Sequence, residues 1–178
     1  KIIVNSPLAP VYKSGDIVIR KAVAAPIIDG VDTDTAWNQT EENSGFSSVF
    51  YMEEPESDTS FKITYDDEAI YLLINCEGAP VPLEAVSFFI APDDTIKGDT
   101  PYYNAVLVPE PDNTLVAYDN NDRYGGVRIQ YASGREYTLK KDIDFNAEYS
   151  IGDTSWTAEV KIPYESLVTS SGATAPAP

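Results

Sequence analysis

The chain has 178 residues, and 43% of them are hydrophobic, which is enough apolar material for one domain with a sizeable core. Its formal net charge of −17 argues against nucleic acid and anionic membranes as partners, because both are recognised through basic patches. The sequence contains no histidine and a single cysteine, which excludes histidine-dependent catalysis, histidine-ligated metals and an intrachain disulfide.

The N-terminal part of the chain is predicted to lead into a first strand. Residues 1–15 contain Pro7 and Pro10 and are expected to form an extended lead-in. Asp16–Val23 is rich in β-branched residues and is predicted to be a strand. Because the chain begins at Lys1 without an initiator methionine, we interpret it as a processed product that has lost any targeting segment. No segment approaches the roughly 18 apolar residues of a membrane span.

The segment after the first strand is predicted to turn and then to form one short helical turn. Asp29-Gly30 is a turn signal, and Asp32 or Thr33 can cap the helical turn that follows. This turn would direct Ala36 and Trp37 toward the interior.

The centre of the predicted fold is a hairpin over Thr59–Glu77. Its apolar residues recur at every second position on both sides of an acidic turn, which is the period of a strand. Tyr71 and Leu73 make the second strand apolar on its other face too, so other strands are expected beside it and over it. Cys76 continues the inward pattern and is expected to be a buried, inert thiol.

Shorter apolar runs predict the remaining strands and complete the fold class. The predicted strands are Phe46–Met52, Ala85–Ala91, Tyr102–Val108, Thr114–Tyr118, Val127–Tyr131, Ile143–Ile151 and Trp156–Ile162. Tyr102–Val108 and Thr114–Tyr118 are expected to pair as a hairpin, and Pro163 to open one helical turn. We therefore predict an all-β fold, a two-sheet antiparallel β-sandwich of jelly-roll or immunoglobulin-like type, over residues 16–168. Residues 169–178 have the composition of a linker-like tail.

Three segments together resemble one family in their order and spacing. They are Ile28-Asp29-Gly30 with Asp32 and Trp37, then Phe61–Tyr71, then Trp156–Pro163. This set resembles the family 9 carbohydrate-binding modules and the wider DOMON-like sandwiches, over about residues 24–167. The resemblance implies a two-sheet antiparallel sandwich, usually attached to secreted or surface proteins that act on polysaccharide.

The resemblance also implies where the sugar-binding residues of the family would fall in this sequence. The best-known members of the family clamp a sugar end between two tryptophans. The first clamp position falls near Val81 and Pro82, where no aromatic residue stands, and the second would lie beyond Pro163, where the chain stops before the strands that would carry it. Trp37 and Trp156 belong to motifs that serve the core in the family, so the resemblance implies structural roles for both.

Acidic loops supply the candidate metal ligands. Calcium takes oxygen ligands from loops and is the metal that these groups would suit, and no other cofactor is expected. The candidate ligands are Asp93, Asp94, Asp99, Asp119, Asn121 and Asp122. The alternative is that these acidic turns are merely solvated, as such residues usually are.

Tyrosine gives the remaining ligand-binding signal. A tyrosine offers a ring face to a sugar and a hydroxyl group to its polar rim. The candidate binding residues are Tyr102, Tyr103, Tyr118, Arg123 and Tyr124. The alternative is that the tyrosines are ordinary cross-strand packing partners.

These observations favour a non-catalytic, extracytoplasmic domain of a larger bacterial surface or secreted protein that binds a glycan or polysaccharide. One alternative is a structural or interaction sandwich with no sugar ligand. A third hypothesis is a small glycan-active enzyme, which would need two carboxyl groups converging in a cleft. Most of the acidic residues lie in predicted turns, which disfavours catalysis.

The C-terminal side of the sandwich is expected to be incomplete. In the family, the segment that corresponds to Trp156–Pro163 is followed by further strands, whereas residues 169–178 have the wrong composition for a strand. Either the native chain continues and supplies the missing strands, which we favour, or a partner domain or chain pairs with an exposed edge.

Overall fold

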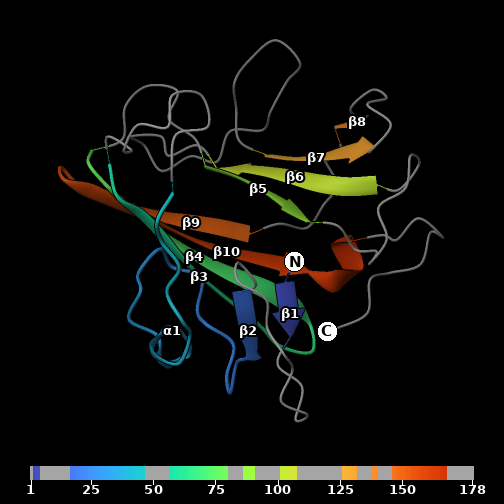
Figure 1. Ribbon diagram of the computed structural model, residues 1–178, viewed down its shortest axis with the longest axis horizontal. Helices are drawn as coiled ribbons and strands as arrows, with labels where there is room; N and C mark the ends of the chain where they lie inside the picture. The colour runs from blue at the N-terminus through green and yellow to red at the C-terminus, as the bar shows by residue number, and fades with distance from the viewer. Residues whose placement is uncertain are drawn as a thin grey trace.

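A computed structural model describes residues 2–4, 17–46, 57–79, 86–90, 101–107, 126–131, 138–139 and 146–167 of the chain. Within these ranges two β-sheets lie one over the other (Figure 1), which confirms the predicted all-β sandwich. The large sheet contains β1 (Ile2–Val4), β2 (Ile17–Lys21), β3 (Thr59–Tyr65), β4 (Ala69–Glu77), β9 (Asn146–Ile151) and β10 (Ser155–Pro163). The small sheet contains β5 (Val86–Ile90), β6 (Pro101–Leu107), β7 (Gly126–Tyr131) and β8 (Thr138–Leu139).

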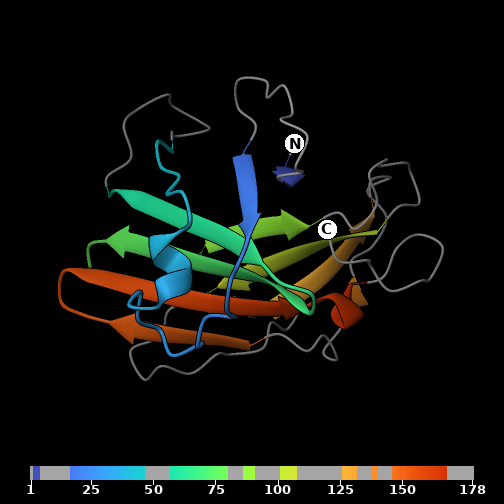
Figure 2. The same ribbon diagram turned by 90° about the horizontal axis from the view of Figure 1, so that it is seen from below.

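The large sheet is mixed, whereas the sequence predicted antiparallel strands throughout. Its strand order is β1-β2-β3-β4-β10-β9, and β2 pairs in parallel with both β1 and β3. The described pairs among the other strands are antiparallel. A parallel pair needs a long crossover, and residues 22–46, which follow β2, cross the outer face of the sheet (Figure 2).

Strand β4 lies in the middle of the large sheet, as its apolar pattern predicted. It pairs with β3 on one side and with β10 on the other. Leu72, Ile74 and Cys76 are buried in the core between the sheets, while Tyr71 and Leu73 are buried on the outer face. The predicted burial of the Cys76 thiol is thereby confirmed.

The core between the sheets is built from alternate residues of the strands. β10 contributes Trp156, Ala158, Val160 and Ile162 at every second position, as a strand with one face toward a core requires. Leu107 of the small sheet is fully buried in the same cluster. The large sheet and the small sheet therefore share one apolar interior.

Two local predictions about helix starts were wrong by one to two residues. Helix α1 (Thr35–Asn38) has Asp34 as its N-cap residue, not Asp32 or Thr33. The Asp34 side chain makes no capping bond, because its Oδ2 accepts a hydrogen bond from the Ile27 N–H at 2.6 Å. Pro163 is the last residue of β10 and precedes the 3-10 turn η1 (Tyr164–Ser166), so it does not occupy the first helical position.

Strand β10 is not an edge strand. β4 and β9 pair with its two sides, and among the described strands β1 and β9 are the outermost of the large sheet. Ile2–Val4 of the predicted lead-in forms β1 beside β2. The predicted strand Thr114–Tyr118, and Phe46–Met52 beyond its first residue, lie outside the described residues. Across the described ranges, no helix has the length and apolar character needed to cross a membrane.

Candidate functional site

The outer face of the large sheet is divided into two halves. The first, which we call the covered half, carries apolar residues of β4 that pack against residues 26–40, including α1 (Figure 2). Trp37, Ala69, Tyr71 and Leu73 form its buried cluster, and Trp37 is 0% exposed. The second, which we call the bare half, lies toward the end of β4 and the start of β3 and β10.

A buried carboxylate fixes residues 26–40 to the covered half. Glu159 of β10 is 0% exposed. Its Oε1 accepts a hydrogen bond from Trp37 Nε1 at 2.6 Å, and its Oε2 accepts from the N–H groups of Asp29 at 2.9 Å and Gly30 at 2.8 Å. Burial raises the pKa of Glu159 above its ordinary value, and the hydrogen bonds from Asp29, Trp37 and Gly30 act in the opposite direction. This one side chain therefore joins β10 both to the turn at residues 29–30 and to α1.

Gly30 allows residues 26–40 to approach the sheet closely. Its φ is +81°, in the left-handed region that favours glycine. A Cβ atom at this position would lie 2.6 Å from the carbonyl carbon of Tyr149 and 2.9 Å from the nitrogen of Ser150. Any larger residue would therefore push this segment away from β9.

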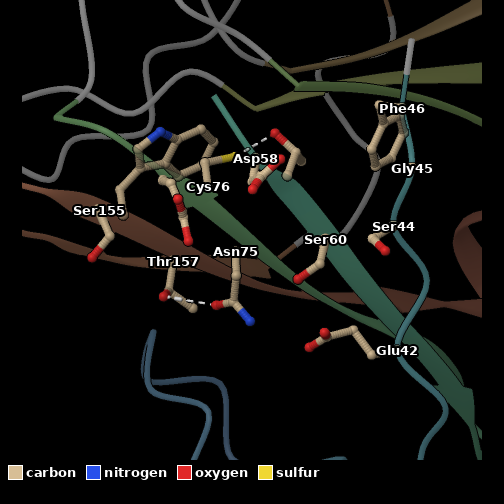
Figure 3. A pocket seen from close by; sticks show the side chains of 13 residues that line it. Glu42, Ser44, Gly45, Phe46, Asp58, Ser60, Asn75, Cys76, Ser155 and Thr157 are labelled. Carbon is tan, nitrogen blue, oxygen red and sulfur yellow. Dashed lines mark hydrogen bonds between the residues drawn. The ribbon is translucent and has the colours of Figure 1, made fainter. Parts of the chain in front are cut away.

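The bare half carries a row of small polar side chains. Ser60 of β3 is opposite Asn75 of β4, and Asn75 is opposite Thr157 of β10. Directly opposite residues of paired strands project from the same face of the sheet. Thr157 Oγ1 donates a hydrogen bond to Asn75 Oδ1 at 2.9 Å (Figure 3). We call Ser60, Asn75 and Thr157 the polar row.

The polar row lines a pocket with a volume of about 680 Å³ at this end of the large sheet. Besides the row, the lining residues are Glu42, Ser44, Gly45, Phe46, Asp58, Thr59, Cys76, Glu77, Ser155 and Trp156. Trp156 is 1% exposed and belongs to the core, so the accessible chemistry comes from the polar groups and from Phe46. The cavity thus has the size of a small-molecule site but a more polar lining than most.

One wall of the pocket is an aromatic ring held beside β3. Asn43 and Phe61 exchange two backbone hydrogen bonds of 2.9 Å, which align residues 43–46 with the edge of β3. Phe46 follows and is 50% exposed, and its ring lies 5.9 Å from that of Phe61 in a tilted contact. Figure 3 shows Phe46 on the same side of the pocket as Ser44 and Gly45. The ring of Phe46 thus lies on the side of β3 toward which Phe61 points, whereas the polar row projects from the other side, and the pocket reaches both.

The charged groups among the described lining residues of the pocket are all acidic. Glu42, Asp58 and Glu77 line it, and none of the lining residues that the structure describes is a lysine or arginine. The pocket can therefore accept hydrogen bonds from hydroxyl groups or cations, and it disfavours anions. In the described part of the chain, no group of three or more His, Cys, Asp or Glu residues is arranged to hold a metal ion.

The binding residues predicted from the sequence lie either on the small sheet or outside the described residues. Tyr102 and Tyr103 lie on β6 of the small sheet, opposite Gln130 and Ile129 of β7. The other candidate binding residues, Tyr118, Arg123 and Tyr124, lie outside the described residues. So do all candidate calcium ligands, Asp93, Asp94, Asp99, Asp119, Asn121 and Asp122, and calcium binding stays a prediction.

Sequence reasoning missed both the polar row and the role of Glu159. One signal for the row was available, because Asn75 interrupts the apolar outward positions of β4 after Tyr71 and Leu73. A signal for Glu159 was the acid in a strand that is otherwise buried at Trp156, Ala158, Val160 and Ile162.

Comparison with known proteins shows which family has the same fold. No protein-family model and no curated protein sequence matches the chain. A family 9 carbohydrate-binding module from Caldicellulosiruptor kristjanssonii, determined in complex with glucose, matches the structure with a TM-score of 0.51 and 17% identity, over 92% of this chain and 69% of that one. A proposed carbohydrate-binding protein from Bacteroides uniformis matches with a TM-score of 0.52 and 14% identity, over 93% of this chain and 74% of that one. The chain therefore has the fold of the family 9 modules, as the sequence motifs indicated, while the wider DOMON-like resemblance stays a prediction.

Proposed function

We propose, starting from a fold like that of the family 9 carbohydrate-binding modules, that this domain binds carbohydrate at the pocket on the bare half of the large sheet. The observation that carries the proposal is one cavity that is lined both by the half-exposed ring of Phe46 and by the polar row. A pyranose has an apolar C–H face and a rim of hydroxyl groups, and this pocket offers a matching surface for each. One protein of similar fold was determined with glucose bound, which supports the same class of ligand here.

The polar groups are suited to hydroxyl groups because they include both donors and acceptors. Glu42, Asp58 and Glu77 accept hydrogen bonds, while the Asn75 amide and the Ser60 hydroxyl group can donate them. A net hydrogen bond contributes about 0.5–1.5 kcal/mol, so a few of them with one ring contact give dissociation constants of about 1 μM to 1 mM. Such affinities suit a module that holds its parent protein near a polysaccharide.

We propose a non-catalytic role for the domain within a secreted or surface protein. Glycoside hydrolysis requires a carboxylic acid whose pKa is raised, placed across a cleft from a second carboxyl group. Glu159, whose pKa is raised, is buried under Trp37 and does not line the pocket. An extracytoplasmic location is proposed because the polysaccharides that such modules meet lie outside the cytoplasm.

Binding of the purified chain to a glycan array, followed by calorimetry on the ligands found, tests the proposal. We expect binding to one class of neutral glycan, with affinity reduced roughly tenfold by Phe46→Ala or Asn75→Ala, the loss of about one good contact each. Val23→Ala is the matched control, because Val23 is exposed but does not line the pocket. A folded chain that binds no glycan would overturn the function, and binding that both pocket variants leave unchanged would overturn the site.

A further inference from the structure

The polar row runs across the strands, not along one of them. Ser60, Asn75 and Thr157 belong to three adjacent strands and are paired by register. Ser150 of β9 is opposite Thr157 and is exposed, so the row continues onto a fourth strand. Neighbouring strands lie about 4.8 Å apart, so the four side chains cover roughly 14 Å in a line. Such a line is longer than a single sugar unit.

Asn75 is held in one orientation within this row. Because Thr157 Oγ1 donates to Asn75 Oδ1, the amide oxygen is already engaged. The two N–H groups of the amide are then directed away from Thr157, as the position of the nitrogen in Figure 3 shows. Thr157 is therefore a positioning residue, and Asn75 is presented as a donor at the middle of the row.

We propose that the domain recognises an internal stretch of a linear, uncharged glycan that lies across the strands of the large sheet. This inference rests on the proposed function and concerns the form of the ligand at the same pocket. A hexose unit advances an extended glycan by about one strand spacing, so successive units can each meet one member of the row. Ser60 contacts the chain at the β3 side, and Ser150 lies at the β9 side. Contact along the length of the chain requires no free chain end.

The charge of the pocket restricts the glycan to an uncharged one. Three acidic side chains, Glu42, Asp58 and Glu77, line the same cavity. A uronic acid or sulfated unit placed there would lie near like charges that the described lining does not neutralise. The proposed ligand is thus a glycan of several units that carries no charge.

Two series of neutral oligosaccharides test this inference by calorimetry: glucose to cellohexaose, and xylose to xylohexaose. In at least one series we expect affinity to rise roughly threefold to tenfold per unit up to three or four units, since each unit adds about one hydrogen-bonding subsite, and then to level off. Reduction of the tetrasaccharide to its alditol should leave affinity within about twofold, because the chain end makes no essential contact. A tetra-uronide of similar linkage should bind at least about tenfold more weakly.

Substitutions in the row separate this binding mode from a general loss of structure. Thr157→Val should weaken the tetrasaccharide by about threefold to tenfold, the effect of one hydrogen bond, while Thr157→Ser should keep wild-type affinity. Glucose or xylose should be affected less than the tetrasaccharide, which a purely structural defect would not produce.

The outcomes distinguish this inference from the proposed function. A monosaccharide that binds as tightly as the tetrasaccharide, or an alditol that loses most of the affinity, would show an end-binding pocket, so the inference fails while the proposed function stands. Binding to other glycans, but to neither series at any length, would also overturn the inference alone. No binding to any glycan would overturn both.

Discussion

The covered half and the bare half of the large sheet are built on the same strands but differ in what their outward residues do. Along β4, the outward residues Ala69, Tyr71 and Leu73 are buried under residues 26–40, whereas Asn75 lines the pocket. Along β10, Glu159 is buried and fully hydrogen-bonded, whereas Thr157 faces the same cavity as Asn75. A change of two residues along a strand thus separates a position that stabilises the fold from one that is available to a ligand.

This comparison predicts large stability effects in the covered half and small ones in the bare half. Trp37→Ala should cost about 3–5 kcal/mol, because it removes a fully buried ring and leaves the Glu159 carboxylate without one donor. For a chain of this size that corresponds to a melting temperature lower by roughly 6–20 °C. Thermal unfolding followed by circular dichroism measures it. Trp156→Ala should have a comparable effect, since Trp156 lies in the core between the sheets.

The variant Trp37→Phe separates packing from hydrogen bonding in the effect of Trp37, and Phe46→Ala compares that effect with the bare half. Trp37→Phe keeps an apolar ring and loses the N–H donor, so it should cost about 1–3 kcal/mol. Phe46→Ala, the corresponding aromatic change in the bare half, should leave the melting temperature nearly unchanged. If Phe46→Ala destabilised the chain as much as Trp37→Ala, the two halves would not differ in the way described.

Gly30→Ala is the next largest change expected. Its Cβ would meet the backbone of Tyr149 at 2.6 Å, so residues 29–31 would have to move and the hydrogen bonds to Glu159 would lengthen. We expect a loss of roughly 3 kcal/mol or more, as for other buried backbone clashes. Chemical denaturation gives the free energy of unfolding.

Gly45→Ala is the control for Gly30→Ala. Gly45 has φ +84°, but no atom of the described residues lies within 4 Å of a Cβ at that position. It should therefore cost only the roughly 1–2 kcal/mol of a left-handed residue. Equal losses for both glycines would mean that the close approach to Tyr149 does not matter.

Protonation of Asp66 makes the stability of the covered half depend on pH. Partial burial opposes ionisation of this carboxyl, but hydrogen bonds from the Glu68 N–H, the Tyr71 hydroxyl group and the Ala69 N–H hold its pKa below the ordinary 3.8. Because the folded-state pKa is lowered, the stabilisation is present above pH 3.8 and is lost as the pH falls through the folded-state pKa.

The variant Asp66→Asn isolates this contribution from those of the other acidic residues. It should be less stable than the wild type at pH 7, by about 1 kcal/mol or less for a partly exposed group. The difference should shrink as the pH falls below 3.8, because the carboxyl of the unfolded chain is protonated at a higher pH than that of the folded chain. Melting temperatures of both proteins between pH 2 and pH 7 provide the measurement. A difference that stays constant down to pH 2 would contradict the assignment.

Asn75→Ala should have the smallest effect on stability. Asn75 is partly exposed, and its described side-chain hydrogen bond is with Thr157, which is itself partly exposed. The free energy of unfolding should change by less than about 0.5 kcal/mol, as for most substitutions outside the core. Paired measurements of unfolding and of glycan binding test this. A large loss of stability would place Asn75 with the covered half.

The sequence predicted those parts of the molecule that depend on local periodicity. The β3–β4 hairpin and the inward pattern of β10 follow from residues alternating at every second position, and their burial agrees with that pattern. The parallel pairing of β2 was not predictable in this way. It depends on a crossover of the sheet, and the five residues of β2 carry no sequence signal for the direction of their neighbours.

The site depends on contacts between segments that are far apart in the chain. The pocket is lined by single polar residues from β3, β4, β10 and residues 42–46, and none of these segments carries a motif on its own. Glu159 is of a residue type that is rarely buried, and its partners lie more than 120 positions earlier. The tyrosines were predicted as binding residues because they are numerous, whereas Phe46 is a single ring that follows Gly45.

The central position of β4 has a consequence for the order in which the chain can fold. The β3–β4 hairpin is local and can form early, but β4 finds its second neighbour only in β10, near the other end of the described chain. Pairing of segments so distant in sequence is slow, because the entropy of closing the intervening loop is lost before the contacts form. Until then, a strand apolar on both faces has one unpaired side and is prone to pair with another chain. We therefore expect the tendency to aggregate to fall once β10 pairs with β4 and residues 26–40 pack against the outer face. Glu159 joins these two segments.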